Sequence, residues 1–275
     1  MPFKTILVHL ANDPKRQARI ETAVRLAERF EAHLVGLCTE EPAHMPNAVT
    51  GRGAALGFLA EETEIHHKEA KCIEREFLDH CKANRVSAEC FTERGIHLKL
   101  LVQYAPFADL AIISQSPTQS FEDKLRLHLP DHLPMLAGCP VFVVPYENAP
   151  KTIGKRILVA WKTSPESGRA VGYALPFLKT AESVTVLTVD PPDHDYVPGA
   201  AVARRLARHG VKVETRSDLA DDSQTGKIIC QTAIDLDCDL VVMGAYGKSR
   251  LRELLLGGVT HHALTHTRVP LLLSH

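Results

Sequence analysis

Hydrophobic and polar positions divide the chain into two kinds of segment. Short apolar runs, such as Leu240-Val241-Val242-Met243, alternate with longer stretches whose apolar residues recur at helical spacing. Short continuous runs are typical of strands buried on both faces, and the longer stretches are typical of amphipathic helices. Strands that alternate with helices predict an α/β fold with a parallel, doubly wound sheet and right-handed crossovers.

The same order of elements is predicted twice along the chain. In the first half we expect strands at 4–10, 33–38, 86–91, 109–113 and 140–144, and helices at 14–29, 54–83, 95–104 and 121–136. In the second half we expect strands at 156–161, 183–189, 211–216, 239–243 and 269–273, and helices at 165–179, 198–209, 223–236 and 257–266.

Direct similarity between the halves supports an internal repeat. The matched segments are Ile6–Leu10 with Ile157–Trp161 at an offset of 151, and Asp109–Ile113 with Asp239–Met243 and Pro140–Val143 with Pro270–Leu273 at an offset of 130. The change in offset places 21 extra residues in the first half, between its second and fourth strands. The proline- and glycine-containing stretch Pro145–Gly154 is typical of a linker. We therefore predict two Rossmann-like domains, 1–147 and 148–275.

Composition and charge narrow the class of protein. The 275 residues carry a formal net charge of −1, so no overall basic field favours nucleic acid or a membrane surface. No stretch approaches the ~20 apolar residues that a membrane-spanning helix needs. The seven cysteines include no Cys-x-x-Cys pair, which suits packed thiols in a reducing compartment. Because Met1–Val8 leads straight into a strand, we expect no signal peptide and a cytoplasmic location.

One glycine-rich pattern in the second half points to chemistry. Gly244-Ala245-Tyr246-Gly247 follows the predicted strand 239–243, and nine residues later comes Gly257-Gly258-Val259-Thr260. Ligands of open parallel sheets bind beyond the carboxyl ends of the strands, where the strand order reverses. Glycine lets backbone N–H groups approach an anion, and a helix N-terminus attracts phosphate. The alternative is that these glycines only form turns and a helix cap.

The spacing of Gly244, Gly247 and Gly257 resembles the nucleotide motif of the universal stress protein family. The resemblance includes the Leu251–Leu256 run and the Arg268-Val269-Pro270 entry to the last strand. It extends over two successive copies of the family pattern, which together cover nearly the whole chain. It implies a tandem, stress-associated cytoplasmic protein that binds ATP or AMP. It also implies dimerisation through the last strand.

The expected nucleotide site lies at the ends of two strands and in the glycine segments. Its residues are Ala160, Trp161, Lys162, Val189, Gly244, Gly247, Gly257, Gly258, Val259 and Thr260. Two of them depart from the family pattern. Gly258 stands where the family has a hydroxyl residue, so that phosphate contact must come from backbone or from Thr260. Lys162 stands where ATP-binding members usually have Asp, and lysine offers only donors, so it suits a phosphate better than a ribose.

The first half is predicted to have lost the nucleotide site. At the offset of 130, Ser114, Pro117 and Leu127 stand where the second half has Gly244, Gly247 and Gly257, and His128 stands opposite Gly258. Proline removes an N–H group, and leucine adds bulk where a phosphate would lie. The segment 47–57 and the helix after it are expected to cover this end of the sheet.

Other polar groups have plainer interpretations. The pairs His262 with His266 and His128 with His132 have metal-ligand spacing on a helix, but a metal site needs three or four ligands. Asp190, Asp193 and Asp195 could assist Mg²⁺ beside a triphosphate, although a solvated acidic loop explains them better. Ser164 and Ser249 suit capping or turn roles.

These observations leave three hypotheses about function. The first is a regulatory protein that binds an adenine nucleotide, ATP or AMP with or without Mg²⁺, in its second domain. The second is an interaction module that binds no nucleotide, for which Lys162 and Gly258 are the main arguments. The third is a slow ATP hydrolase, although we identify no catalytic residue in the sequence. The two halves are expected to pack as an intramolecular pseudo-dimer through Val141–Val144 and Leu271–Leu273.

Overall fold

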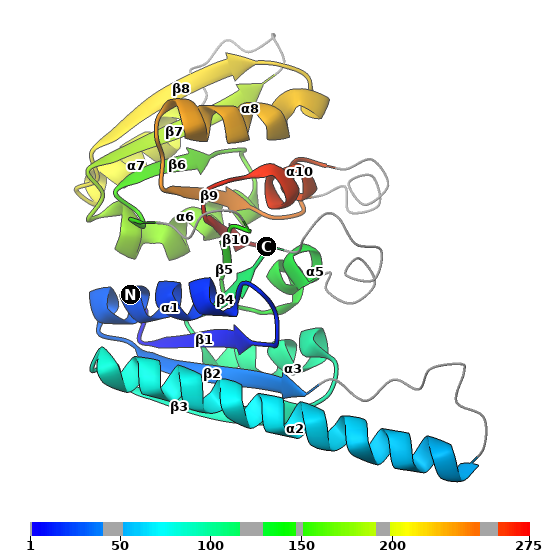
Figure 1. Ribbon diagram of the computed structural model, residues 1–275. Coiled ribbons are helices and arrows are strands. Elements are labelled where there is room, and N and C mark those ends of the chain that lie inside the picture. The colour runs from blue at the N-terminus through cyan, green and yellow to red at the C-terminus, as the bar shows by residue number, and fades with distance from the viewer. Residues whose placement is uncertain (1, 41–51, 116–128, 147–150, 191–198, 248–257) are drawn as a thin grey trace. The chain divides into compact units, whose positions relative to one another are not determined.

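A computed structural model describes residues 2–40, 52–115, 129–146, 151–190, 199–247 and 258–275 (Figure 1). The chain divides into two compact units. One is Lys4–Ile112, and the other is Ile113–His275 together with Met1–Phe3. Both units consist mostly of parallel strands connected through helices.

The unit Lys4–Ile112 contains a parallel sheet in the order β3-β2-β1-β4. Its elements are β1 (Thr5–Leu10), α1 (Arg16–Phe30), β2 (His33–Glu40), α2 (Arg52–Ala83), β3 (Ala88–Arg94), α3 (His97–Tyr104), a 3₁₀ turn η1 (Ala105–Phe107) and β4 (Leu110–Ser114). The central strand β1 is almost entirely buried because it lies between β2 and β4.

The C-terminal half of α2 packs on this sheet. Ala70, Ile73, Phe77 and Cys81 recur at helical spacing and are all buried. Cys72, on the opposite face of the helix, is exposed. The length of α2 accounts for the extra residues predicted in the first half, since its counterpart α7 spans only Ala200–Arg208.

The second unit contains strands in the order β5-β10-β9-β6-β7-β8. Its elements are α5 (Leu129–Leu136), β5 (Val141–Val144), β6 (Arg156–Ala160), α6 (Pro165–Leu178), β7 (Ser183–Asp190), α7 (Ala200–Arg208), β8 (Val213–Leu219), α8 (Asp222–Asp235), β9 (Leu240–Gly244), α10 (Val259–His266) and β10 (Leu271–Ser274). Neighbouring strands are parallel from β10 through β9, β6 and β7 to β8.

The pair β5 and β10 is antiparallel. Leu271 lies opposite Val143, Leu272 opposite Phe142 and Leu273 opposite Val141. Both strands are fully buried. Phe142 and Leu272 are equivalent positions of the two repeats, since they are 130 residues apart. The pairing is therefore centred on equivalent residues, as expected for two copies of one strand related by a twofold axis.

The predicted fold class is confirmed, because the described chain is mixed α/β with mostly parallel strands. The largest boundary differences at strands concern β3 and β8, which run beyond the predicted ends at 91 and 216. Each stands at the end of the strand order in its unit, and an edge strand can continue through polar residues that a buried strand excludes. No helix of the described segments is long and apolar enough to cross a membrane.

The two compact units do not coincide with the predicted repeats. Residues 113–146 belong to the first repeat by sequence, but they group with the second repeat because β5 pairs with β10. The boundary between repeats at 147 and 148 stays a prediction.

Gly36 provides a test of the packing between α2 and β2. A Cβ on Gly36 would lie 2.7 Å from the Phe77 ring and 2.8 Å from Leu10, both of which are buried. We expect Gly36→Ala to lower the free energy of unfolding by about 1–3 kcal/mol, as overpacking of a core typically does. Urea denaturation measures the change.

Gly57→Ala is the matched control, because a Cβ at Gly57 in α2 meets open space. It should raise stability by up to ~1 kcal/mol through helix propensity. Equal stability of Gly36→Ala and the wild type would contradict the described packing.

Candidate functional site

The candidate site lies at the carboxyl ends of β6 and β9. Ala160, the last residue of β6, is paired with Met243, and β9 ends at the next residue, Gly244. The strand β6 is paired with β9 on one side and with β7 on the other. The connections that leave β6 and enter β9 therefore lead to opposite sides of β6. Such a reversal of strand order is where open α/β sheets bind ligands. The predicted glycine segment therefore begins at the expected place in the fold.

Gly244 allows the start of α6 to approach β9. A Cβ at Gly244 would lie 2.6 Å from the backbone nitrogen of Ser167 and 2.9 Å from Glu166. Ser164 caps α6, since its hydroxyl accepts a hydrogen bond from the Ser167 N–H at 3.2 Å. The capping interpretation of Ser164 is thus confirmed. Ser249 lies outside the described residues.

Tyr246 has an unusual backbone conformation within the loop. Its φ is +49°, whereas neither Gly244 nor Gly247 has a positive φ. The left-handed region is a true outlier for a bulky residue. Tyr246 is buried, and its N–H donates to the hydroxyl of Thr260 at 3.3 Å. The loop is thus attached to the beginning of α10. Sequence reasoning missed this feature because a tyrosine gives no signal of left-handed backbone.

The start of α10 lies close to this loop. The helix begins at Val259, and Gly258 is its N-cap residue, with φ −56° and ψ 173°. Glycine has no capping side chain, so backbone N–H groups of the first turn are left for another acceptor. Thr260 is buried, and its oxygen already accepts from Tyr246. Gly257 lies outside the described residues.

The other expected site residues surround the same edge of the sheet. The N–H of Trp161 donates to the carbonyl of Leu187 at 2.8 Å, which continues the pairing of β6 with β7. Lys162 follows it and is exposed. Val189, near the end of β7, is partly buried and lies one strand farther from Gly244.

A charged network borders the loop. Arg169 donates to Glu166 Oε1 at 3.3 Å and to the carbonyl of His275 at 2.8 Å, and His275 Nδ1 lies 3.0 Å from the carbonyl oxygen of Ala245. The second oxygen, Glu166 Oε2, is buried without a hydrogen-bond partner and lies 3.9 Å from the position of a Cβ on Gly247.

Glu166 is held in its ionised form. Burial opposes ionisation, but the backbone N–H of Glu166, the Ser164 hydroxyl and Arg169 together lower the pKa of the carboxyl. A negative charge therefore lies against the glycine loop. Sequence reasoning missed this charge, because Glu166 is separated from the loop by most of the second half.

Comparison with known proteins finds a family match for the part of the chain that contains the candidate site. The sequence profile of the Universal stress protein family matches residues 154–275. This part of the chain therefore has the sequence pattern of a universal stress protein domain. No curated protein sequence matches the chain.

Solved structures extend the likeness to the whole chain at the level of fold. A universal stress protein from Archaeoglobus fulgidus superposes with a TM-score of 0.75 at 13% identity, covering 98% of this chain and 95% of that one. A putative universal stress protein from Pseudomonas aeruginosa gives a TM-score of 0.61 at 17% identity, covering 99% and 93%. The fold of the whole chain is therefore similar to that of these two proteins.

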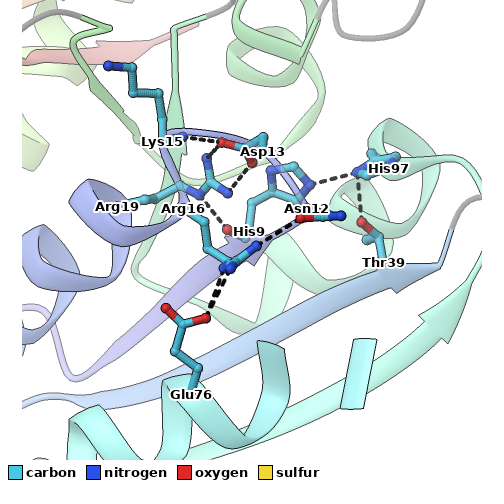
Figure 2. Close-up of polar contacts among 9 residues, drawn as sticks. All are labelled: His9, Asn12, Asp13, Lys15, Arg16, Arg19, Thr39, Glu76 and His97. Atoms are coloured by element: carbon cyan, nitrogen blue, oxygen red, sulfur yellow. Dashed lines mark hydrogen bonds and ion pairs between the residues drawn. The ribbon is translucent and has the colours of Figure 1, made fainter. Parts of the chain in front are cut away.

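In the first repeat, buried polar side chains occupy the end of the sheet that corresponds to the glycine-loop site. His9, which corresponds to Ala160, and His97 are buried, and His9 Nε2 lies 2.7 Å from His97 Nδ1 (Figure 2). The Thr39 hydroxyl lies 2.7 Å from the same His97 nitrogen. The His9 imidazole thus stands at the strand position where the second repeat has the methyl group of Ala160.

An arginine completes this cluster. Arg19 is 2% exposed, donates to the carbonyl of His9 at 2.5 Å and pairs with Asp13 at 2.6 Å (Figure 2). Pro117, Leu127 and His128, on which the predicted loss of the site depends, lie outside the described residues, while Ser114 ends β4. The described cluster supports the prediction on separate grounds, because it fills this end of the sheet with side chains.

The remaining candidates show no metal chemistry in the described residues. The rings of His262 and His266 are stacked with centroids 4.1 Å apart. No group of three His, Cys, Asp or Glu side chains that could hold a metal occurs within the segments that the structure describes. His128, Asp193 and Asp195 lie outside those segments.

The buried His9 predicts a specific dependence of stability on pH. Burial, together with the nearby Arg19 and His97, holds the pKa of His9 well below its usual value. The unfolded chain therefore binds a proton below about pH 6.5 that the folded chain does not. The stability contributed by neutral His9 is complete above this pH and is lost as pH falls, by at most about 1.4 kcal/mol per pH unit.

Substitution of His9 tests this assignment. His9→Gln keeps an N–H donor toward His97 but does not titrate. Its urea-unfolding midpoint should fall less steeply than that of the wild type between about pH 6.5 and pH 5. His209→Gln, at an exposed position after α7, is the control. Parallel pH profiles of His9→Gln and the wild type would disprove the role of His9.

Proposed function

We propose that this universal stress protein is a stress-associated regulatory protein that binds an adenine nucleotide, ATP or AMP, in its second domain, 148–275. The supporting observation is the arrangement of Gly244–Gly247 at the carboxyl end of β9, attached by Tyr246 and Thr260 to the N-terminus of α10. Loop N–H groups and a helix N-terminus that converge at one sheet edge form a site suited to phosphate. The protein acts by sensing the nucleotide in the cytoplasm, through conformation rather than fast catalysis.

The charges near the loop bear on how the nucleotide is held. Lys162 is exposed beyond β6 and can contact a phosphate as a point charge. Glu166 by itself would repel a phosphate. Mg²⁺ commonly joins a carboxylate to phosphate oxygens, and Glu166 Oε2 is a buried oxygen without a hydrogen-bond partner. We therefore include Mg²⁺ in the proposal, with Glu166 as the residue that would hold it.

The two repeats associate through β5 and β10 in this proposal, as an intramolecular pseudo-dimer. The antiparallel register pairs equivalent positions of the two repeats, Phe142 with Leu272. This pairing uses the last strand of each repeat, through which the family resemblance implies dimerisation. The internal contact thus takes the place of that between two separate chains.

A second candidate function is an interaction module that binds no nucleotide. The observation that favours it is Lys162, which cannot accept a hydrogen bond from a ribose hydroxyl. Isothermal titration calorimetry of the purified chain with ATP and with AMP separates the two candidates. Saturable heat with either nucleotide supports the first, and its absence with both supports the second.

Gly258 provides the sharpest test of the phosphate site. Its φ of −56° is open to any residue, so a side chain there adds bulk without backbone strain. Gly258→Val should weaken nucleotide binding at least about tenfold, or ~1.4 kcal/mol, by screening the helix N–H groups. Gly258→Ser introduces a hydroxyl at that position and should strengthen binding by about the same factor.

Melting temperatures of the free variants control for unfolding. Both should lie within a few degrees of the wild type, with Gly258→Ser slightly higher because serine is a good N-cap. Equal nucleotide affinity in Gly258→Val, Gly258→Ser and the wild type would place the nucleotide elsewhere.

Glu166 provides a separate test of the metal. In the wild type, Mg²⁺ should increase ATP affinity, because it shields the phosphates from the Glu166 carboxylate. In Glu166→Gln, ATP affinity without Mg²⁺ should rise and the dependence on Mg²⁺ should shrink. Glu182→Gln, at an exposed position, is the control. A wild-type dependence on Mg²⁺ that Glu166→Gln leaves unchanged would rule out this role.

A further inference from the structure

The glycine loop of the second repeat contacts a helix that belongs to the first repeat by sequence. This helix, α5, packs against α10 within the unit Ile113–His275. Its first turn contains Asp131. Asp131 Oδ1 accepts a hydrogen bond from the Tyr246 hydroxyl at 3.1 Å, and it lies 3.0 Å from His261 Nδ1.

These contacts connect the two elements of the proposed phosphate site. Tyr246 lies in the loop after β9, and His261 lies in the first turn of α10. One carboxylate oxygen therefore joins the loop to the helix N-terminus. The Tyr246 N–H bond to Thr260 makes a second connection between the same elements. Together they fix the spacing between the backbone groups that a phosphate would contact.

The contact with Asp131 helps to hold Tyr246 in its left-handed conformation. A non-glycine residue keeps a positive φ only where its surroundings determine the conformation. The Tyr246 side chain is 5% exposed, its N–H is bound to Thr260, and its hydroxyl is bound to Asp131. Backbone and side chain are thus both held, and the side-chain contact comes from the other repeat.

The position of Asp131 in the repeat explains how it reaches this site. Asp131 and His261 are 130 residues apart, so they are equivalent positions of the two repeats, as Phe142 and Leu272 are in the β5–β10 pair. Equivalent residues meet at a twofold axis. If the two repeats were identical in sequence, two identical side chains would meet at this axis. Because the repeats differ, a carboxylate from the first meets an imidazole from the second. The hydrogen bond that His261 donates to the Asp131 carboxylate raises the pKa of His261, despite partial burial that opposes the charge.

We propose that Asp131 of the first repeat is a positioning residue for the nucleotide site of the second repeat, acting through Tyr246 and His261. This inference rests on the proposed function and adds a role for the first repeat. The first repeat does not bind the nucleotide itself but supplies the carboxylate that orders the loop and the helix N-terminus.

Two substitutions that remove the same hydrogen bond test the proposal in the full chain. Asp131→Ala and Tyr246→Phe should each weaken AMP or ATP binding about tenfold in calorimetry. The nucleotide affinity of the double variant should be no lower than that of the weaker-binding single variant. Asp131→Asn keeps an acceptor for the Tyr246 hydroxyl, so its affinity should stay close to that of the wild type. Asp235→Ala removes an exposed carboxylate on α8 and is the matched control.

Two measurements on the free protein test the contacts without any nucleotide. The pKa of His261, followed by NMR of its ring protons, should fall in both Asp131→Asn and Asp131→Ala. Hydrogen exchange of the Ala245, Tyr246 and Gly247 amides should become faster in Asp131→Ala and Tyr246→Phe and remain unchanged in Asp235→Ala. Because these measurements need no ligand, they separate the positioning role from nucleotide binding.

The outcomes distinguish this inference from the proposed function. Nucleotide binding by the wild type that Asp131→Ala and Tyr246→Phe leave unchanged would overturn the positioning role alone. No nucleotide binding by the wild type would overturn the proposed function, and with it the positioning of a nucleotide. In that case faster loop exchange in Asp131→Ala would still support the ordering of the loop by Asp131. Unchanged exchange would overturn that as well.

Discussion

The antiparallel pairing of β5 with β10 is the constraint on which the rest of the second unit depends. The two strands are fully buried, and their register places equivalent residues of the two repeats opposite each other. Next to β10 lies β9, which leads into the glycine loop, and the Ala245 N–H donates to the carbonyl of Ser274 in β10. The helices α5 and α10, which precede β5 and β10 in the chain, also pack against each other. This packing brings Asp131 of α5 to Tyr246. Strand pairing and loop conformation are therefore connected.

The two repeats show how one fold can carry different sites. In the second repeat β6 ends in Ala160, and beyond it lie a loop and a helix N-terminus with backbone N–H groups. In the first repeat the corresponding residue is His9, whose ring meets His97 and whose carbonyl is bound by Arg19. There the Arg19 guanidinium binds the His9 carbonyl and Asp13, and the His9 ring binds His97. The proposed site thus consists of backbone N–H groups, whereas the corresponding end of the first repeat holds buried side chains that bind other groups of the protein.

Most of the fold could be predicted from the sequence because its signals are local. Apolar runs place the parallel strands, and the repeat offset locates the long helix α2. The position of Gly244 at the end of β9 followed from general rules of sheet topology. The edges were less predictable, since the polar ends of β3 and β8 carry no hydrophobic signal.

The details of the site could not be predicted, because they depend on contacts between distant segments. Glu166 meets the loop only once α6 packs against β9, and Gly244 is needed there for that close approach. The left-handed conformation of Tyr246 contradicts local preference and is supported by Thr260 and Asp131. Sequence reasoning considered only the glycines of this loop, whereas its left-handed residue is a tyrosine whose N–H and hydroxyl are both bound.

The central claim is that an adenine nucleotide binds at the glycine loop of the second repeat and not at the corresponding end of the first. Backbone amide NMR shifts of the labelled full chain, followed during titration with AMP, test it most directly. The account predicts saturable shifts at Ala245, Tyr246, Gly247 and the first turn of α10, with no shift at His9, Thr39 or His97. Saturable shifts confined to the first repeat, or no shift at the glycine loop with either AMP or ATP, would contradict it.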